Sequence, residues 1–209
     1  MSINKLINDI DNLKYSNISN VIDGRIKEFK SINRESNEDI FKEMCFCLLT
    51  ANFSAERSIK IHENINDCFL TDSEEELSNK LKNMGHRFPN ARANYIAESK
   101  KCKNQLSNVM KFHDNNKIRD WVVKSVKGLG YKEASHFLRN IGFDDFAIID
   151  FHIIDLLVDY SIIKKPKTLT KKKYIEIEKC LKDIANEVDL SLAELDLYLW
   201  YIETGKILK

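Results

Sequence analysis

Apolar residues recur along the chain at the three-to-four-residue spacing of amphipathic helices, and no stretch keeps the alternation of a strand. Only six glycines and two prolines interrupt this pattern in 209 residues. The pattern predicts helices over 3–13, 17–30, 40–49, 55–64, 117–125 and 132–141, with further helices after residues 73, 89, 150, 170 and 191. We therefore predict an all-α fold in which two helical subdomains flank a cleft, within one domain spanning 1–209.

Side chains that cap helices mark several of the predicted starts. Three pairs have the spacing of a capping box, namely Ser36 with Asp39, Ser73 with Glu76 and Ser191 with Glu194. Pro89 suits the first turn of a helix that runs to Cys102, because its missing N–H needs no partner there. Asp150 is a natural N-cap for a helix that runs to about Tyr160.

Composition and charge narrow the class of protein only a little. The chain is 43% hydrophobic and 31% charged, as in ordinary globular proteins. No apolar run approaches the ~20 residues of a membrane span, and residues 1–13 lack the apolar core of a signal peptide. We expect a cytoplasmic protein with no membrane partner.

The formal charge is −4 over residues 1–84 and +5 over residues 85–209. This distribution allows a basic face, although a solvated lysine surface gives the same counts.

The five cysteines do not indicate a disulfide framework or a metal site. Their number is odd and their spacing irregular, at Cys45, Cys47, Cys68, Cys102 and Cys180. The first two are too close together for a normal zinc pair, and there is no second pair. The four-cysteine loop of an iron–sulfur cluster is also missing from the sequence. We expect neither a metal nor another cofactor.

The most informative stretch runs from Val126 to His152. Gly128 and Gly130 lie between two predicted helices, Lys132 follows them, and Asp150 ends an apolar run. A glycine hairpin lets backbone amides approach a phosphate closely, because glycine has no Cβ. A lysine beside such a hairpin is placed to act as an amine nucleophile near that phosphate.

This stretch resembles the helix-hairpin-helix and aspartate motif of the base-excision DNA glycosylases, with the hairpin motif at 117–152. The position that proline usually takes is occupied by Lys127. Within that superfamily the chain is most similar to the archaeal-type (type 2) 8-oxoguanine DNA glycosylases over roughly residues 40–209. Four further segments carry this resemblance: Cys45-Phe-Cys-Leu-Leu-Thr-Ala-Asn-Phe-Ser54, Gly85-His-Arg-Phe88, Glu133-Ala-Ser-His-Phe-Leu-Arg139 and Leu195-Asp-Leu-Tyr-Leu-Trp-Tyr201.

The resemblance implies an enzyme with two activities, a DNA glycosylase and a lyase for abasic sites. Lys132 corresponds to the nucleophile that attacks the sugar C1′, displaces the base and forms a Schiff base, after which β-elimination nicks the strand. The amine must be neutral to attack. Asp150 corresponds to the carboxylate that stabilises positive charge on the sugar or helps to move a proton.

The resemblance also implies how the DNA is held and how the target base leaves the duplex. Gly128, Leu129, Gly130 and His152 are expected to bind phosphates. Extrusion of a base costs a few kcal/mol, and a side chain must fill the gap. That role is implied for Asn52 and Phe88, while two arginines, Arg87 and Arg92, are expected to recognise the orphaned cytosine.

Two residues near the end of the chain are expected to recognise the damaged base. The face of Trp200 can stack on a flipped purine, and the resemblance gives the final residue, Lys209, a part in base recognition. 8-oxoguanine differs from guanine by an N7–H donor and an O8 acceptor, which a carboxylate and an ammonium group complement. The expected partner is duplex DNA that contains 8-oxoguanine, bound by a monomer.

Two other functions are compatible with parts of the sequence. A glycosylase of the same superfamily could prefer another oxidised base. A non-catalytic helix-hairpin-helix module would also bind DNA, and it needs the glycines but neither Lys132 nor Asp150. Several of these residues also have a plain structural explanation: Trp200 and Phe88 as core residues, the arginines as solvated charges, and Asp150 as a helix cap.

Overall fold

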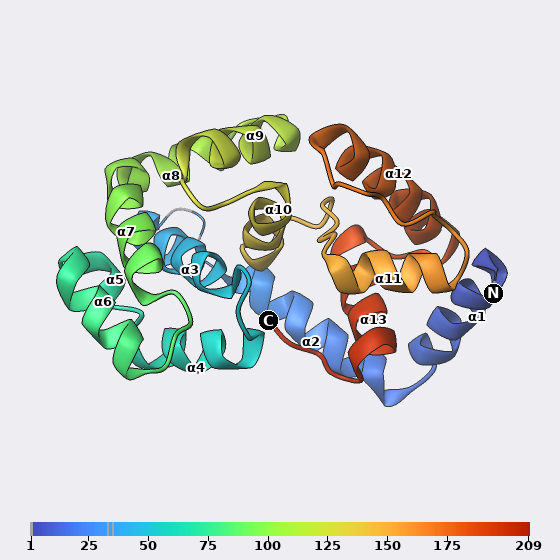
Figure 1. Cartoon of the computed structure of the whole chain (residues 1–209). Helices are drawn as coiled ribbons and strands as arrows, with labels where there is room; N and C mark the ends of the chain where they lie inside the picture. The colour runs from blue at the N-terminus through green and yellow to red at the C-terminus, as the bar shows by residue number, and fades with distance from the viewer. Residues whose placement is uncertain (1, 33, 35) are drawn as a thin grey trace. The chain divides into compact units, whose positions relative to one another are not determined.

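The computed structural model describes residues 2–32, 34 and 36–209, and these contain helices and no strand (Figure 1). The prediction of an all-α fold is therefore confirmed. The chain divides into two compact units. Unit 1 combines Met1–Ser31 with Gly142–Leu208, and unit 2 consists of Ile32–Ile141 together with Lys209.

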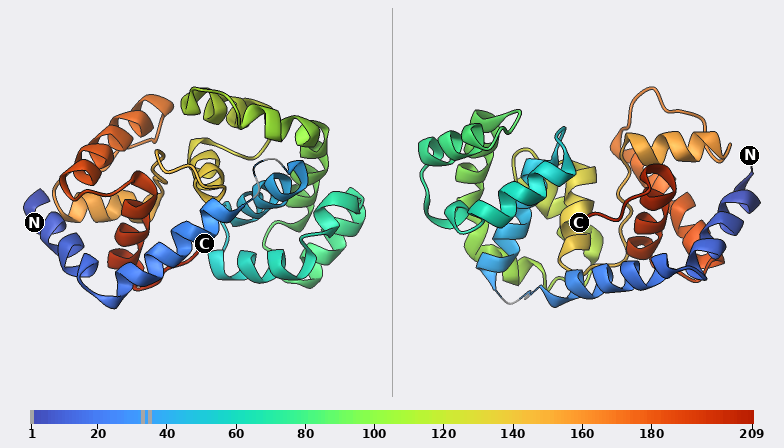
Figure 2. Two further views of the ribbon diagram at one scale, coloured as in Figure 1. Left: turned by 180° about the vertical axis from the view of Figure 1, so that it is seen from behind. Right: turned by 90° about the horizontal axis from the view of Figure 1, so that it is seen from below.

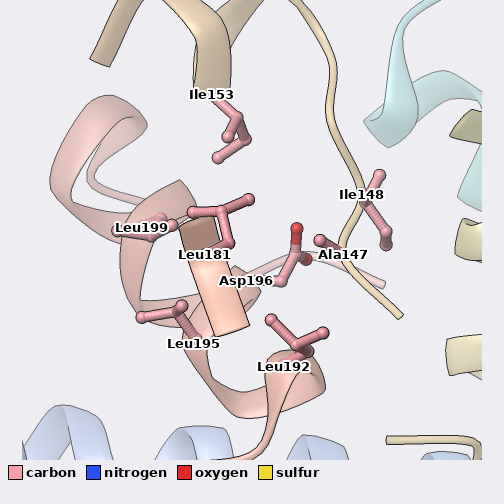
Figure 3. A pocket seen from close by; sticks show the side chains of 8 residues that line it. All are labelled: Ala147, Ile148, Ile153, Leu181, Leu192, Leu195, Asp196 and Leu199. Atoms are coloured by element: carbon pink, nitrogen blue, oxygen red, sulfur yellow. The ribbon is translucent and has the colours of Figure 1, made fainter. Parts of the chain in front are cut away.

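Unit 1 is built around its last helix. Its helices are α1 (Ile3–Lys14), α2 (Asn17–Ser31), α11 (Phe151–Asp159), α12 (Lys171–Glu187) and α13 (Leu192–Thr204). Helix α13 packs against each of the other four, and its inward residues Leu195, Leu197 and Leu199 are almost fully buried. A small cavity lies between α11, α12 and α13, and its lining is apolar except for Asp196 (Figure 3). The cavity contains none of the predicted site residues.

Unit 2 is built around α3 (Asn37–Thr50), in which every residue from Met44 to Thr50 is buried. Its other helices are α4 (Ala55–Ile65), α5 (Cys68–Thr71), α6 (Glu74–Asn83), α7 (Pro89–Ser99), α8 (Leu106–Val109), α9 (Asn115–Ser125) and α10 (Tyr131–Asn140), with a 3-10 helix, η1, at Lys100–Gln105. Helix α3 contacts α4, α5, α7, α8, η1 and α10. The views in Figure 2 show α10 beside α3.

The predicted caps account well for where the helices begin. Ser73 and Ser191 form complete capping boxes with Glu76 and Glu194. Ser36 accepts the N–H of Asp39. No hydrogen bond from the N–H of Ser36 to the Asp39 carboxylate is recorded among the described residues, so this cap is a single bond and not a full capping box. Pro89 begins α7, as predicted.

Two segments differ from the prediction. The helix that begins at Pro89 was expected to reach Cys102, but it ends at Ser99 and continues as η1 and then α8. The run Lys100–Gln105 has no clear apolar period, and Leu106 and Val109 are buried where α8 packs against α3 and η1. The short helix α5 was not predicted, because four residues are too few to show a period. No helix in the described part of the chain is both long and apolar enough to span a bilayer.

Candidate active site and DNA interface

The hairpin between α9 and α10 requires glycine at one of its two glycine positions. Gly128 has φ +95°, and a Cβ there would stand 2.5 Å from Cδ2 of the Tyr95 ring. Both the left-handed backbone and the ring disfavour any other residue at this position. Gly130 is the N-cap of α10 in an ordinary extended conformation, and a Cβ there would meet only Glu133 Oε2 at 3.5 Å. The close approach of Tyr95 to Gly128 fixes the hairpin against α7.

The backbone amides of the hairpin are not equally available to a ligand. The N–H of Leu129 donates to the carbonyl of Val126 at 3.2 Å, and the leucine side chain is 4% exposed. Among the residues that the structure describes, no acceptor is recorded for the N–H groups of Gly128 and Gly130. The N–H of Leu129 therefore holds the hairpin together, and the N–H groups of the two glycines are the ones left available to a ligand.

Lys132 lies in the first turn of α10, directly after this hairpin. Its side chain is 25% exposed, and its Nζ lies 3.8 Å from Glu133 Oε1. Charge on Lys132 also acts on two buried groups of unit 2, the Cys47 thiol, whose pKa is raised mainly by burial, and the His136 imidazole, whose pKa is lowered mainly by burial. The amine is thus close to the interior of unit 2 while it still reaches the surface.

Lys127, which occupies the usual proline position, is engaged elsewhere. Its Nζ donates to Glu98 Oε1 at 2.7 Å and lies 5.6 Å from the centre of the Tyr95 ring. The hydrogen bond to Glu98 raises the pKa of Lys127 above its usual value. This cation therefore serves to tie the hairpin to α7.

Unit 1 carries Asp150 and an aromatic group beside it. Asp150 is the N-cap of α11, with Oδ1 accepting the N–H of Ile153 at 3.0 Å, as predicted. The ring of His152 lies 3.9 Å from that of Phe151 and meets Trp200 edge-on at 5.0 Å. Nδ1 of His152 lies 3.7 Å from Glu203 Oε1. Asp150, His152 and Trp200 are thus three predicted site residues that unit 1 holds near the start of α11.

The two expected wedge residues lie on turns of unit 2 that share one histidine. Asn52 is exposed, with φ +55°, in the turn between α3 and α4. The ring of His86 stacks on Phe53 at 4.2 Å, hydrogen-bonds the Leu49 carbonyl at 3.1 Å and accepts the N–H of Phe88 at 3.0 Å. His86 therefore fixes the turn that carries Asn52 and the turn that carries Phe88 to each other.

The two arginines have different environments. Arg87 is exposed, and its guanidinium lies 5.0 Å from the centre of the Phe88 ring. Arg92 is only 7% exposed, donates to the Ala51 carbonyl and lies 5.6 Å from the same ring. Burial lowers the pKa of Arg92 below its usual value. Arg92 therefore ties α7 to the turn that carries Asn52, while Arg87 stays exposed.

Lys209 lies in unit 2 beside α3 and α10 (Figure 2). Its Nζ pairs with Glu43 Oε2 at 2.5 Å and lies 4.9 Å from the centre of the Phe46 ring. Glu43 was not predicted as a site residue, although an acid inside an apolar helix is a recognisable signal. Tyr95, His86 and Phe151, a 66% exposed aromatic residue directly after Asp150, were not predicted either.

Buried imidazoles in unit 2 predict a loss of stability in acid. Burial lowers the pKa of His62 to about 4 and lowers the pKa values of His86 and His136 below 6.5. Below pH 6.5 the unfolded chain binds more protons than the folded chain. The free energy of unfolding is therefore highest above that pH and falls toward pH 4, by at most about 1.4 kcal/mol per pH unit for each imidazole.

Urea unfolding between about pH 7 and about pH 5 measures this slope. The variant His62→Phe removes one titrating group between the Phe46 and Phe69 rings and should reduce the slope. A slope that is the same in wild type and His62→Phe would contradict the assignment.

A glycine hairpin between two helices, a lysine directly after it and a capping aspartate 18 residues further on define the class of protein: a helix-hairpin-helix DNA glycosylase. The family model described as 8-oxoguanine DNA glycosylase matches residues 22–190. The chain belongs to the 8-oxoguanine DNA glycosylase family.

Relatives of known name match over nearly the whole chain. An 8-oxoguanine DNA glycosylase/AP lyase of Methanocaldococcus jannaschii is 54% identical over 98% of this chain and 99% of its own length. One from Korarchaeum cryptofilum is 51% identical over the full length of both chains. Both are described as glycosylase and lyase, which are the two activities that the sequence analysis predicts.

Solved structures agree with the sequence relatives. The structure of the M. jannaschii 8-oxoguanine glycosylase/lyase with a 15mer DNA containing 8-oxoguanine matches with a TM-score of 0.95 at 53% identity, covering 98% of this chain and all of that one. The Thermotoga maritima 8-oxoguanine DNA glycosylase matches with a TM-score of 0.93 at 38% identity, covering 99% of this chain and all of that one.

Proposed function

We infer that this chain excises 8-oxoguanine from duplex DNA and then nicks the abasic strand by β-elimination. The observation that carries this conclusion is the match to relatives described as 8-oxoguanine DNA glycosylase/AP lyase over 98% of this chain, including the hairpin and Lys132 at the start of α10. An amine nucleophile is what distinguishes a glycosylase that is also a lyase from one that only hydrolyses the base, because only an amine gives a Schiff base.

We assign the chemical steps to Lys132 and Asp150. The neutral Lys132 amine attacks C1′, the bond from C1′ to the base nitrogen breaks, and the base leaves with the bonding electrons and takes up a proton. The amine then loses its proton as the sugar ring opens and the Schiff base forms. Removal of a C2′ proton expels the 3′ phosphate. Asp150, an acceptor-only group that is fixed by its cap hydrogen bond to Ile153, stabilises positive charge on the sugar.

We assign the grip on the DNA to the hairpin and the two turns of unit 2. The amides of Gly128 and Gly130 bind a phosphate, supported by the positive end of the α10 dipole. Phe88 enters the stack from one turn and Asn52 from the other, while Arg87 recognises the orphaned base. His152 donates to a second phosphate from unit 1. Anchored side chains support these contacts: Leu129 in the hairpin and Arg92 beneath the turns.

We assign recognition of the damaged base to Trp200 and Lys209. The half-buried Trp200 offers an aromatic face for the flipped purine, and Lys209 offers N–H donors for O8.

The glycosylase domain comprises the whole of residues 1–209, and the chain acts as a cytoplasmic monomer at the nucleoid. The proposed chemistry uses an amine and a carboxylate of the chain and requires no cofactor.

Borohydride trapping of the wild-type chain tests the proposed function. Reduction of the Schiff base should yield a covalent adduct on duplexes that contain 8-oxoguanine opposite cytosine. Duplexes with an oxidised pyrimidine and undamaged duplexes serve as controls. Trapping on the oxidised pyrimidine alone would show that the chain is a glycosylase for another oxidised base. No adduct on any oxidised base would contradict the enzyme assignment and favour a non-catalytic DNA-binding module.

A further inference from the structure

A buried carboxylate interrupts the apolar face of α3. Glu43 is 2% exposed, and its neighbours Met44, Cys45 and Cys47 are fully buried. A carboxylate withdrawn from water is costly unless hydrogen bonds and an opposite charge satisfy it. The side chains that satisfy Glu43 therefore indicate what the group is for.

Glu43 stands in a chain of hydrogen bonds whose direction is fixed. Nε and Nη2 of Arg139 donate to Asn140 Oδ1 at 3.1 and 2.9 Å, and Asn140 Nδ2 donates to Glu43 Oε1 at 2.7 Å. Because Arg139 has only donors, the amide of Asn140 must turn its oxygen toward Arg139 and its nitrogen toward Glu43. One carboxylate oxygen is thereby held, and the other, Oε2, accepts Lys209 Nζ at 2.5 Å.

The main chain of Lys209 is held separately. It shares a hydrogen bond with the imidazole of His136, which lies on α10 as do Arg139 and Asn140. Side chain and main chain of Lys209 are therefore both fixed to unit 2. A free lysine side chain has about 2 kcal/mol of rotamer entropy to lose when it is ordered. Fixing it before DNA arrives removes that cost from the binding step.

We propose that Glu43, held by Asn140 and Arg139, is a positioning residue that sets the Lys209 ammonium for recognition of the damaged base. The proposal rests on the assignment of Lys209 to base recognition made above. An ammonium has three donors, and the contact with Glu43 uses one, so two remain for an acceptor such as O8. Glu43 touches neither the sugar nor the nucleophile in this account, and it acts through Lys209.

The test separates excision of 8-oxoguanine from cleavage of preformed abasic sites, which present no base. Glu43→Gln keeps an acceptor for Asn140 but removes the charge that holds Lys209. Loss of this charge-assisted contact should lower 8-oxoguanine excision about tenfold and leave abasic cleavage unchanged. Glu38→Gln is the matched control, because it makes the same change on the same helix in an exposed ion pair with Lys103. It should affect neither reaction.

A double-mutant cycle decides whether Glu43 acts through Lys209. Deletion of Lys209 should lower excision selectively, and Glu43→Gln should add no further loss in that background. Independent, additive losses would overturn the proposal, as would an equal loss of excision and abasic cleavage in Glu43→Gln. A Lys209 deletion that affects both reactions equally would instead refute the role of Lys209 itself.

Glu43→Asp keeps the proposal testable if Glu43→Gln does not fold. This variant retains the charge but shortens the side chain by one methylene, so that the carboxylate cannot keep both Asn140 and Lys209 at their present distances. It should lower excision of 8-oxoguanine and preserve abasic cleavage. Full excision activity in Glu43→Asp would overturn the proposal.

Discussion

Exchange of Lys132 for glutamine should abolish the borohydride adduct on 8-oxoguanine DNA and lower strand cleavage by a factor on the order of 10³ or more, as loss of a nucleophile does elsewhere. Glutamine is similar in length and polar, but its amide nitrogen cannot form a Schiff base. The side chain of Lys132 has one recorded ion pair, a long contact of 3.8 Å with Glu133, so its removal should disturb the fold little.

Three measurements make this prediction specific. Gel quantification of the trapped adduct reports the covalent step, duplex affinity reports binding, and urea unfolding reports stability. Affinity and stability should stay close to wild type, so that the defect lies in chemistry. Lys124→Gln is the control, since Lys124 is an exposed lysine on α9. An adduct that persists in Lys132→Gln would assign the nucleophile to a different amine.

The second large effect concerns the hairpin. Gly128→Ala should lower the free energy of unfolding by about 2–4 kcal/mol, of which about 1–2 comes from the left-handed backbone and the rest from overpacking against Tyr95. The added methyl would stand 2.5 Å from Cδ2 of that ring, so the ring or the hairpin must move. Movement of the hairpin displaces the amide groups proposed to bind phosphate, and duplex affinity should fall as well.

Gly130→Ala separates stability from binding on the same hairpin. Its Cβ would make an ordinary contact with Glu133 at 3.5 Å, and its backbone is extended, so the variant should fold with nearly wild-type stability. A loss of duplex affinity in Gly130→Ala therefore reports directly on the approach of a phosphate. A Gly128→Ala chain as stable as wild type would contradict the role given to Tyr95.

Local signals in the sequence predicted most of the helices. Ser73, Ser191 and Asp150 begin helices through hydrogen bonds to residues three positions along, and such bonds depend on neighbours in sequence. The segment 100–109 was not predicted, since its conformation depends on packing against α3 and its own residues show no period. The helix-hairpin-helix motif was predictable through its resemblance to the DNA glycosylases, and Gly128 has the left-handed backbone that favours glycine.

The parts of the site that escaped prediction depend on contacts between residues distant in sequence. Arg92 is an ordinary charge in the sequence, and only the Ala51 carbonyl explains its burial. The two glycines of the hairpin look equivalent, yet Tyr95 makes one of them obligatory. Glu43 is visible as an acid among apolar residues, but no local pattern reveals Asn140 and Lys209 as its partners.

The division of unit 1 into two segments has a consequence for the newly made chain. Helices α1 and α2 are synthesised before the rest of unit 1, which begins at Gly142. They pack against each other and against α13, which lies in that later segment. All of residues 32–141 are synthesised in between, so the helices of unit 2 are complete while the faces of α1 and α2 that contact α13 are still uncovered. The contacts of α1 and α2 with α13 therefore form only after the helices of unit 2 have been synthesised.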